Sequence, residues 1–195
     1  MGKELPIISS GAQPSQPEEA EAVVYSRVFC SRENSPPLRL LLDFLKSKGQ
    51  VPLVPKMDQE ALDDWAWVQV GIGYHRERKP IQLFCLRDRG SYQDAFEQEQ
   101  KAFLDRLSIY DDIEAQLARE YVTRARFIAT SRFVQADMTE EGYDFNGWIL
   151  EFFQENCNGI VHIDGQGFFS PKGDLIVDMQ EAGSDVDAIP DHKQP

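Results

Sequence analysis

The stretch DDWAWVQVGIGYH, residues 63–75, contains two unlike sets of alternating side chains. Successive side chains of a β-strand point to opposite faces of a sheet, so residues 65–74 are expected to form one strand with two different faces. One set is small and apolar, as a helix-covered face requires, and comprises Ala66, Val68, Val70 and Ile72. The other set comprises Trp65, Trp67, Gln69, Gly71, Gly73 and His75. Its glycines leave bare backbone, which a ligand, another part of the chain or a second copy could approach closely.

The flanking segments extend this strand into a β-α-β-β unit. Residues 22–30 are rich in β-branched and aromatic side chains and predict a strand, and residues 80–87 predict another. Between them, apolar residues recur at i, i+3, i+4 and i+7 over residues 38–45, which indicates a helix that Ser35 can cap and Gly49 ends. Two further helices are expected over residues 91–107 and 112–121, with Asp112 in a capping position.

The same order of elements follows in the second half. Residues 125–135 predict a strand, residues 143–157 a helix, and residues 160–163, 167–170 and 175–178 three short strands. We therefore expect an α+β fold of tandem β-α-β-β units of ferredoxin-like type, with a mainly antiparallel sheet and helices on one face. The expected organisation is a tail over residues 1–21, a first unit with its following helix over 22–110, a second helix and unit over 111–178, and an acidic tail over 179–195. The two units are expected to share one core.

The alternation in the two long strands adds residues to the face that carries the tryptophans. Within residues 22–30 it places Tyr25 and Arg27 on that face, and within residues 125–135 it adds Arg132. The candidate ligand- or partner-binding residues are thus Trp65, Trp67, Gln69, His75, Tyr25, Arg27 and Arg132. Large aromatics are mostly packing residues, so this face is either core, with its arginines paired to acids, or a groove for a partner peptide or a small anion.

The composition indicates which classes of partner and which location are favoured. The formal net charge of −13 disfavours binding to nucleic acid and to anionic membranes, and it is compatible with a basic protein partner. Cys30, Cys85 and Cys157 are odd in number and widely spaced, which gives no disulfide framework and favours a reducing, cytoplasmic location. No stretch approaches the roughly 20 apolar residues of a membrane-spanning helix.

Motifs for cofactor or metal chemistry are not apparent in the sequence. Gly71 and Gly73 lack the third glycine of a dinucleotide fingerprint, and residues 164–174 lack the spacing of a calcium loop. We expect no metal, no cofactor and no catalytic residue. A cysteine nucleophile would need activation, which Cys157 at a helix C-terminus does not receive from the helix dipole, while Cys30 beside Arg32 is the best placed of the three.

Two functions remain open from the sequence. The first is a small acidic cytoplasmic binding or regulatory protein without catalytic activity that engages a protein partner, or its own copy, through the Trp/Arg sheet face. The alternative is an enzyme or ligand-binding protein that acts on a small anion held by Arg27, Arg132, Trp65 and His75. A closed pocket would favour the second, and a flat or grooved face would favour the first.

Overall fold

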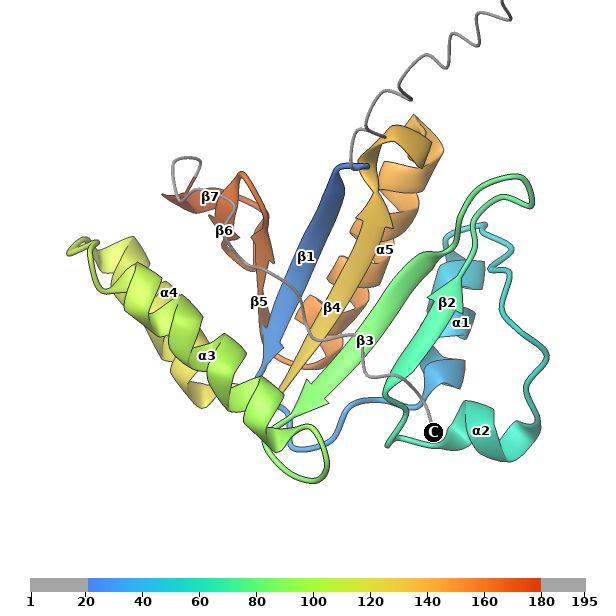
Figure 1. Cartoon of the computed structure of the whole chain (residues 1–195), viewed down its shortest axis with the longest axis horizontal. Coiled ribbons are helices and arrows are strands. Elements are labelled where there is room, and N and C mark those ends of the chain that lie inside the picture. Colours follow the sequence, from blue (N-terminus) through green and yellow to red (C-terminus); the bar gives the residue numbers. More distant parts are fainter. Residues whose placement is uncertain (1–20, 180–195) are drawn as a thin grey trace, which may run out of the picture.

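One antiparallel sheet organises the computed structural model, which describes residues 21–179. The expected tails over residues 1–21 and 179–195 therefore lie almost wholly outside the described residues. The described strands form a seven-stranded sheet in the order β2-β3-β4-β1-β5-β6-β7 (Figure 1). Their bounds are β1 Val23–Cys30, β2 Gln69–Ile72, β3 Ile81–Arg87, β4 Phe127–Val134, β5 Gly159–Ile163, β6 Gly167–Phe169 and β7 Leu175–Asp178. All strand pairs are antiparallel, which confirms the predicted α+β class and sheet type.

The helices follow the apolar stripes and capping residues of the sequence. Their bounds are α1 Leu38–Ser47, α2 Gln59–Asp63, α3 Gln93–Leu107, α4 Ile113–Arg124 and α5 Glu140–Asn156. Asp112 caps α4, as predicted, by accepting a 2.6 Å hydrogen bond from the Ala115 amide. Ser35 does not cap α1. The helix begins after Pro37 without a side-chain cap, and the Ser35 hydroxyl instead donates to the Trp65 carbonyl oxygen.

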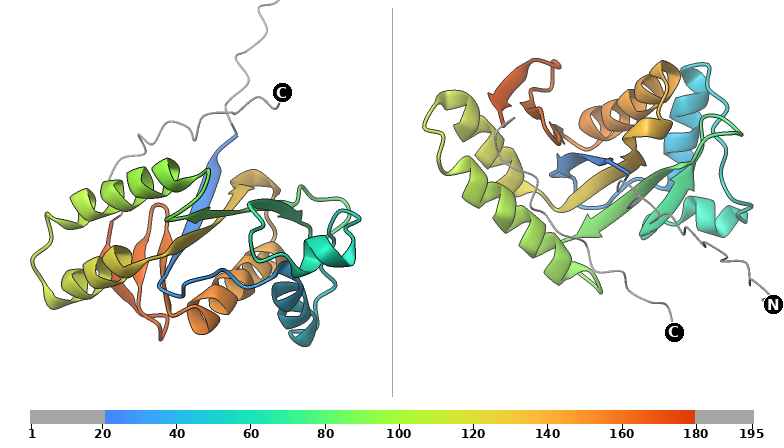
Figure 2. Two further views of the ribbon diagram at one scale, coloured as in Figure 1. Left: turned by 90° about the horizontal axis from the view of Figure 1, so that it is seen from below. Right: turned by 45° about the horizontal axis from the view of Figure 1, so that its top comes forward.

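Helices cover both faces of the sheet, which corrects the expectation of helices on one face. On β1, Val28 and Cys30 point into a core with α1 and α5, whereas Phe29 points into a second core with α3 and α4. We call these the first face and the second face. Figure 2 shows α1 and α5 on one side of the sheet and α3 and α4 on the other. The reason lies in the β3–β4 connection: α3 and α4 each have an apolar side, and the first face is already covered.

The strand order does not confirm the ferredoxin-like arrangement of the two units. β1 lies between β4 and β5, both from the second half of the chain, and it pairs with β4 over all eight of its residues. β3 likewise pairs with β4. Along the chain the first half reads β-α-α-β-β, because α2 follows α1, and β1 lies among the strands of the second half, so the two halves form one sheet.

The strand expected over residues 65–74 is shorter than predicted. β2 begins at Gln69 and ends at Ile72, and residues 64–68 form a turn and a short irregular segment before it. Val70 and Ile72 face the first-face core, as the alternation predicted. The alternation does not extend back to the tryptophans, because it holds only within the strand itself.

Candidate functional site

Part of the second face is not covered by α3 and α4. Figure 1 views the sheet from this side and shows α3 and α4 over one end, while much of β2, β3, β4 and β1 has no helix in front of it. Two rows of side chains cross these four strands on this face. One row is Gly71, Gln82, Arg132 and Tyr25, and the adjoining row is Gln69, Phe84, Thr130 and Arg27. We call these eight residues the polar shelf.

The polar shelf contains four of the seven residues that the sequence put forward as a site. Tyr25, Gln69, Arg27 and Arg132 lie on it, and strand alternation alone was sufficient to place them together. Gln82 was not among the predicted site residues. It lies in β3 opposite Arg132, and its side-chain oxygen is 3.4 Å from the Gln69 amide nitrogen. The alternation of residues 80–87 could have identified it.

Arg132 carries the accessible charge of the polar shelf. Its side chain is partly exposed, and its Nε donates a 3.2 Å hydrogen bond to the Tyr25 hydroxyl. The guanidinium carbon lies 6.0 Å from the centre of the Tyr25 ring, a cation–π distance. Among residues 21–179, no carboxylate lies within ion-pair distance of Arg132. The guanidinium therefore has N–H groups left to donate hydrogen bonds to a carboxylate or carbonyl group of a binding partner.

Arg27, by contrast, is fully engaged within the protein. Only 5% of the residue is exposed, and its guanidinium donates to Glu99 of α3 and, over 2.6 Å, to Asp164 in the β5–β6 turn. Two carboxylates thus neutralise one buried arginine. Arg27 joins α3 and the β5–β6 turn to the central strand, and it is not free to bind an external anion.

His162 is the register partner of Arg27 in the sheet, and its side chain is buried. Its ring packs between Phe103 and Phe168, with ring centres 4.6 and 4.9 Å away, and its Nδ1 lies 3.8 Å from an Asp164 oxygen. Burial lowers the pKa of His162 well below its ordinary value, and the nearby charges of Arg27 and Arg106 lower it further. The imidazole is therefore neutral at physiological pH.

The two tryptophans do not lie on the polar shelf. Trp67 is buried in the first-face core, and its Nε1 donates a 2.9 Å hydrogen bond to the Pro36 carbonyl oxygen. Trp65 is 43% exposed, and its ring lies 5.6 Å from the guanidinium carbon of Arg89. Trp67 therefore belongs to the core, and Trp65 to a separate surface beside Arg89.

Arg87, which was not among the predicted site residues, binds the backbone of residues 65–67. One of its terminal nitrogens donates to the carbonyl oxygens of Trp65 and Trp67, over 2.8 and 2.6 Å, and to the Ser35 hydroxyl over 2.7 Å. The residue is only 9% exposed. A buried arginine that binds these backbone carbonyls holds residues 65–67 in a conformation other than a strand.

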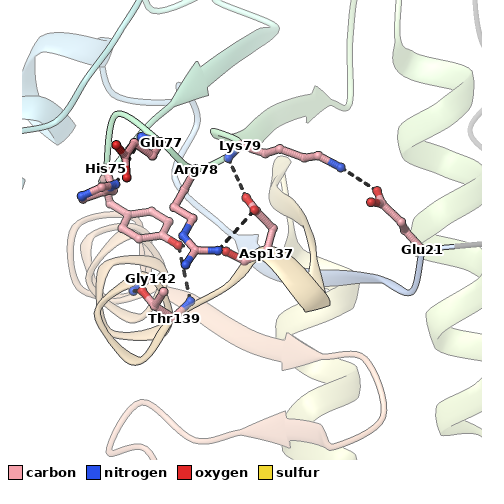
Figure 3. Close-up of polar contacts among 9 residues, drawn as sticks. Glu21, His75, Glu77, Arg78, Lys79, Asp137, Thr139 and Gly142 are labelled. Carbon is pink, nitrogen blue, oxygen red and sulfur yellow. Dashed lines mark hydrogen bonds and ion pairs between the residues drawn. The ribbon is translucent and has the colours of Figure 1, made fainter.

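His75 lies in the β2–β3 turn, away from the polar shelf. Its Nδ1 accepts a 3.2 Å hydrogen bond from the Glu77 amide, and the turn is anchored to the segment before α5 (Figure 3). Asp137 makes that anchor: one of its oxygens accepts a 2.6 Å hydrogen bond from the Lys79 amide, and its carbonyl accepts one of 3.2 Å from the Tyr74 hydroxyl. The surroundings of His75 thus indicate a structural turn.

The described residues show no metal-binding cluster. Within residues 21–179, no group of three or more His, Cys, Asp or Glu side chains is arranged to hold a metal ion. A shallow hollow on α4 contains none of the candidate residues and is lined by Gln116, Arg119, Glu120, Thr123 and Arg124. None of the helices over residues 21–179 combines the length and the apolar character needed to cross a bilayer.

Comparisons with known proteins add no relative. No protein-family model, no curated protein and no solved structure matches this chain. The candidate site therefore rests on the geometry of the polar shelf.

Proposed function

We propose that this chain is a binding protein without catalytic activity that engages a protein partner through the polar shelf. The observation that carries the proposal is the partly exposed Arg132 on an uncovered area of four adjacent strands, with no carboxylate of residues 21–179 in ion-pair distance. Arginine and tyrosine contribute strongly to binding energy where a surface binds a protein. A broad sheet surface suits a macromolecule better than a small substrate, which is usually held in a concave pocket.

The placement of the residues proposed for the alternative function does not support it. An anion-binding enzyme site was expected to combine Arg27, Arg132, Trp65 and His75. Arg27 is neutralised by two carboxylates, Trp65 lies beside Arg89, and His75 lies in the β2–β3 turn. Only Arg27 and Arg132 share the polar shelf.

Photo-crosslinking in the native cells tests the proposal. We would place a benzophenone amino acid at position 82, in the centre of the polar shelf, and at position 101 on the outer side of α3. We expect position 82 to crosslink to a protein and Arg132→Gln to reduce the yield at least several-fold. Arg124→Gln is the matched control, because Arg124 is an exposed arginine on α4 whose loss should leave the yield unchanged.

The mass of the crosslinked adduct shows whether the partner is a second copy of this chain or a different protein. An adduct of twice the chain mass identifies a second copy as the partner, and any other mass identifies a different protein. No adduct at position 82, or the same adducts in the same yield from positions 82 and 101, would contradict the proposal. Circular dichroism of Arg132→Gln confirms that any loss of crosslinking occurs in a folded protein.

A further inference from the structure

The fold brings two of the three cysteines close together. Cys30 ends β1 and Cys157 directly follows α5, yet both side chains lie in the first-face core, and Cys30 is the register partner of Gly159, two residues beyond Cys157. The Cys30 thiol donates a 3.5 Å hydrogen bond to the Val28 carbonyl oxygen. Both are buried and present as free thiols. Cys85 is also free and buried, but it lies on β3, and β4 separates β3 from β1. The close pair is therefore Cys30 and Cys157.

The main chain holds the two cysteine-bearing segments side by side. Cys30 is the register partner of Gly159, and the Arg32 amide donates a 3.3 Å hydrogen bond to the Cys157 carbonyl oxygen. The Ser31 hydroxyl and the Asn158 carbonyl oxygen are also 3.3 Å apart. These hydrogen bonds hold residues 30–32 and 157–159 side by side, so the two cysteines lie on adjacent segments of the backbone.

Arg32 supplies positive charge to one member of the pair. Its guanidinium donates a 3.3 Å hydrogen bond to the carbonyl oxygen of Asn156, the residue before Cys157. Arg32 is exposed, and no carboxylate of residues 21–179 lies within ion-pair distance of it. Cys157 therefore lies directly beneath a surface arginine whose charge is not otherwise neutralised.

The two thiols differ in acidity in a way that assigns their roles. The neighbouring Cys30 thiol lowers the pKa of Cys157, and the charge of Arg32 lowers it further, against the opposing effect of burial. Burial raises the pKa of Cys30 well above its ordinary value. The helix dipole at the end of α5 disfavours a thiolate, but Cys30 and Arg32 compensate for it. Cys157 is thus the better nucleophile, although Cys30 was the more favourable of the two from the sequence.

We propose that Cys157 and Cys30 form a peroxide-reactive dithiol, in which Cys157 attacks the oxidant and Cys30 completes a disulfide bond. In the first step, the Cys157 thiolate attacks one oxygen of hydrogen peroxide, the O–O bond breaks, and protonation of the departing hydroxide gives water and a sulfenic acid. In the second step, the Cys30 sulfur attacks the Cys157 sulfur, loses its proton and displaces hydroxide, which leaves as a second water. The pair loses two electrons and two protons, and one peroxide is reduced to two waters.

Cys85 does not take part in this chemistry. Burial raises the pKa of Cys85 to about 11, and its strand is not adjacent to β1. It therefore serves as an internal control within the same molecule.

The test is peroxide treatment of the folded, fully reduced protein, followed by unfolding, alkylation and mass spectrometry. We expect Cys85 alone to be alkylated and a peptide containing Cys30 to be linked to one containing Cys157, so that the intact mass lies two hydrogen atoms below that of the reduced chain with one alkyl group. A thiol reductant should reverse the change, and Cys85→Ser should behave as the wild type. If all three cysteines are alkylated after excess peroxide, or if Cys85 enters the disulfide as often as Cys30, the proposal is wrong.

Two variants test the assigned roles. In Cys30→Ser, which lacks the second thiol, Cys157 should remain a sulfenic acid that a 1,3-dione reagent captures. Arg32→Gln should slow disulfide formation at least several-fold while Arg32→Lys largely preserves the rate, because Lys retains the charge. Capture on Cys85 in place of Cys157, or equal rates for Arg32→Gln and wild type with native circular dichroism, would overturn the proposal.

Discussion

Arg27 and Arg132 occupy neighbouring strands and the same face of the sheet, yet their environments are opposite. Arg27 is 5% exposed and is held between Glu99 and Asp164. Arg132 is partly exposed, and the only side-chain hydrogen bond that it makes within residues 21–179 joins it to the Tyr25 hydroxyl. The position of α3 explains the difference, because this helix carries Glu99 over Arg27 and does not supply a carboxylate to Arg132.

Replacing Arg27 should therefore destabilise the protein strongly. Arg27→Met leaves two carboxylates near apolar surroundings without their cation, and we expect a loss of about 3 kcal/mol in the free energy of unfolding. Urea unfolding followed by circular dichroism measures the loss. Arg132→Gln is the matched control and should cost less than about 1 kcal/mol, because it removes one partly exposed hydrogen bond. Equal losses for the two variants would contradict the structural role of Arg27.

His162 should make the stability of the protein depend on pH. The folded state holds the pKa of His162 well below its ordinary value, so below about pH 6.5 the unfolded chain binds a proton that the folded chain does not. Stability should consequently be highest above pH 6.5 and fall as the pH decreases, by up to about 1.4 kcal/mol per pH unit. Urea unfolding at pH 7.5, 6.5 and 5.5 measures this slope.

The variant His162→Gln isolates this contribution. Arg27 and Arg106 are the cations that face the imidazole, Asp164 is the carboxylate beside it, and Glu99 pairs with Arg27. The variant should therefore lose most of the slope between pH 7.5 and 5.5, whatever its absolute stability. An unchanged slope would show that another group is responsible.

The sequence predicted the face of a residue better than its environment. Strand alternation is a local property, and it correctly grouped Tyr25, Arg27 and Arg132. It misplaced Trp67, because the start of β2 is decided by Arg87, which lies 20 residues away and binds the Trp67 carbonyl oxygen. Pairing of Arg27 with acids was one of two alternatives from the sequence, but Glu99 and Asp164 could be identified only from the fold.

Among the helices, α5 shows how a single element is fitted to its neighbour. Thr139 caps its N-terminus by accepting a 3.2 Å hydrogen bond from the Gly142 amide. Gly142 lies in the first turn against the Tyr74 ring, whose hydroxyl donates to the Asp137 carbonyl oxygen and accepts from the Thr139 amide. Gly147, one and a half turns later, faces open space. Gly142 allows the β2–β3 turn to pack closely against α5, whereas no neighbouring element packs against Gly147.

These two glycines should respond oppositely to alanine. A Cβ at position 142 would lie 2.6 Å from the Tyr74 ring, which its hydrogen bonds hold in place, so Gly142→Ala should destabilise the protein by about 1–3 kcal/mol. Gly147→Ala meets no atom within 4 Å and should stabilise the protein by up to about 1 kcal/mol through helix propensity. Thermal unfolding of both variants measures the difference. Stabilisation by both substitutions would show that Tyr74 does not constrain the helix.

The elements that carry strong local signals were predictable. α4 has Asp112 as its cap, and α1 has a clear apolar stripe, so both were expected within a few residues of their actual bounds. α2 was missed, because this five-residue helix lies in a proline-containing connection and buries no side chain. α5 begins at Glu140, before the predicted residue 143, because Thr139 caps it.

At the scale of the whole molecule, the chain builds two cores on one sheet. α1 and α5 enclose one core, and α3 and α4 enclose the other, with Phe29, Ile128 and Phe168 among its sheet residues. The sequence predicted both α3 and α4 as helices. It could not indicate which face they cover, because a long connection between adjacent antiparallel strands can fold back over either side.

Removing the α3–α4 pair should expose the second core. Arg87 and Phe127 are register partners, so residues 89–125 can be replaced by an Asn-Gly turn without disturbing the sheet geometry. The shortened chain should aggregate and bind a hydrophobic dye much more strongly than the full chain, because Phe29, Ile128 and Phe168 lose their cover. Gel filtration and dye fluorescence measure this. A soluble, monomeric product with unchanged dye fluorescence would show that the second core is not required.

The position of β1 also determines when the chain can fold during synthesis. β1 is the first strand to leave the ribosome, but both of its neighbours, β4 and β5, are encoded more than 90 residues later. Until residue 163 has emerged, at least one edge of this largely buried strand has no partner, and its apolar residues depend on transient cover. Pairing over such a separation in sequence also slows folding. The central strand of the finished sheet is thus the one that waits longest for its partners.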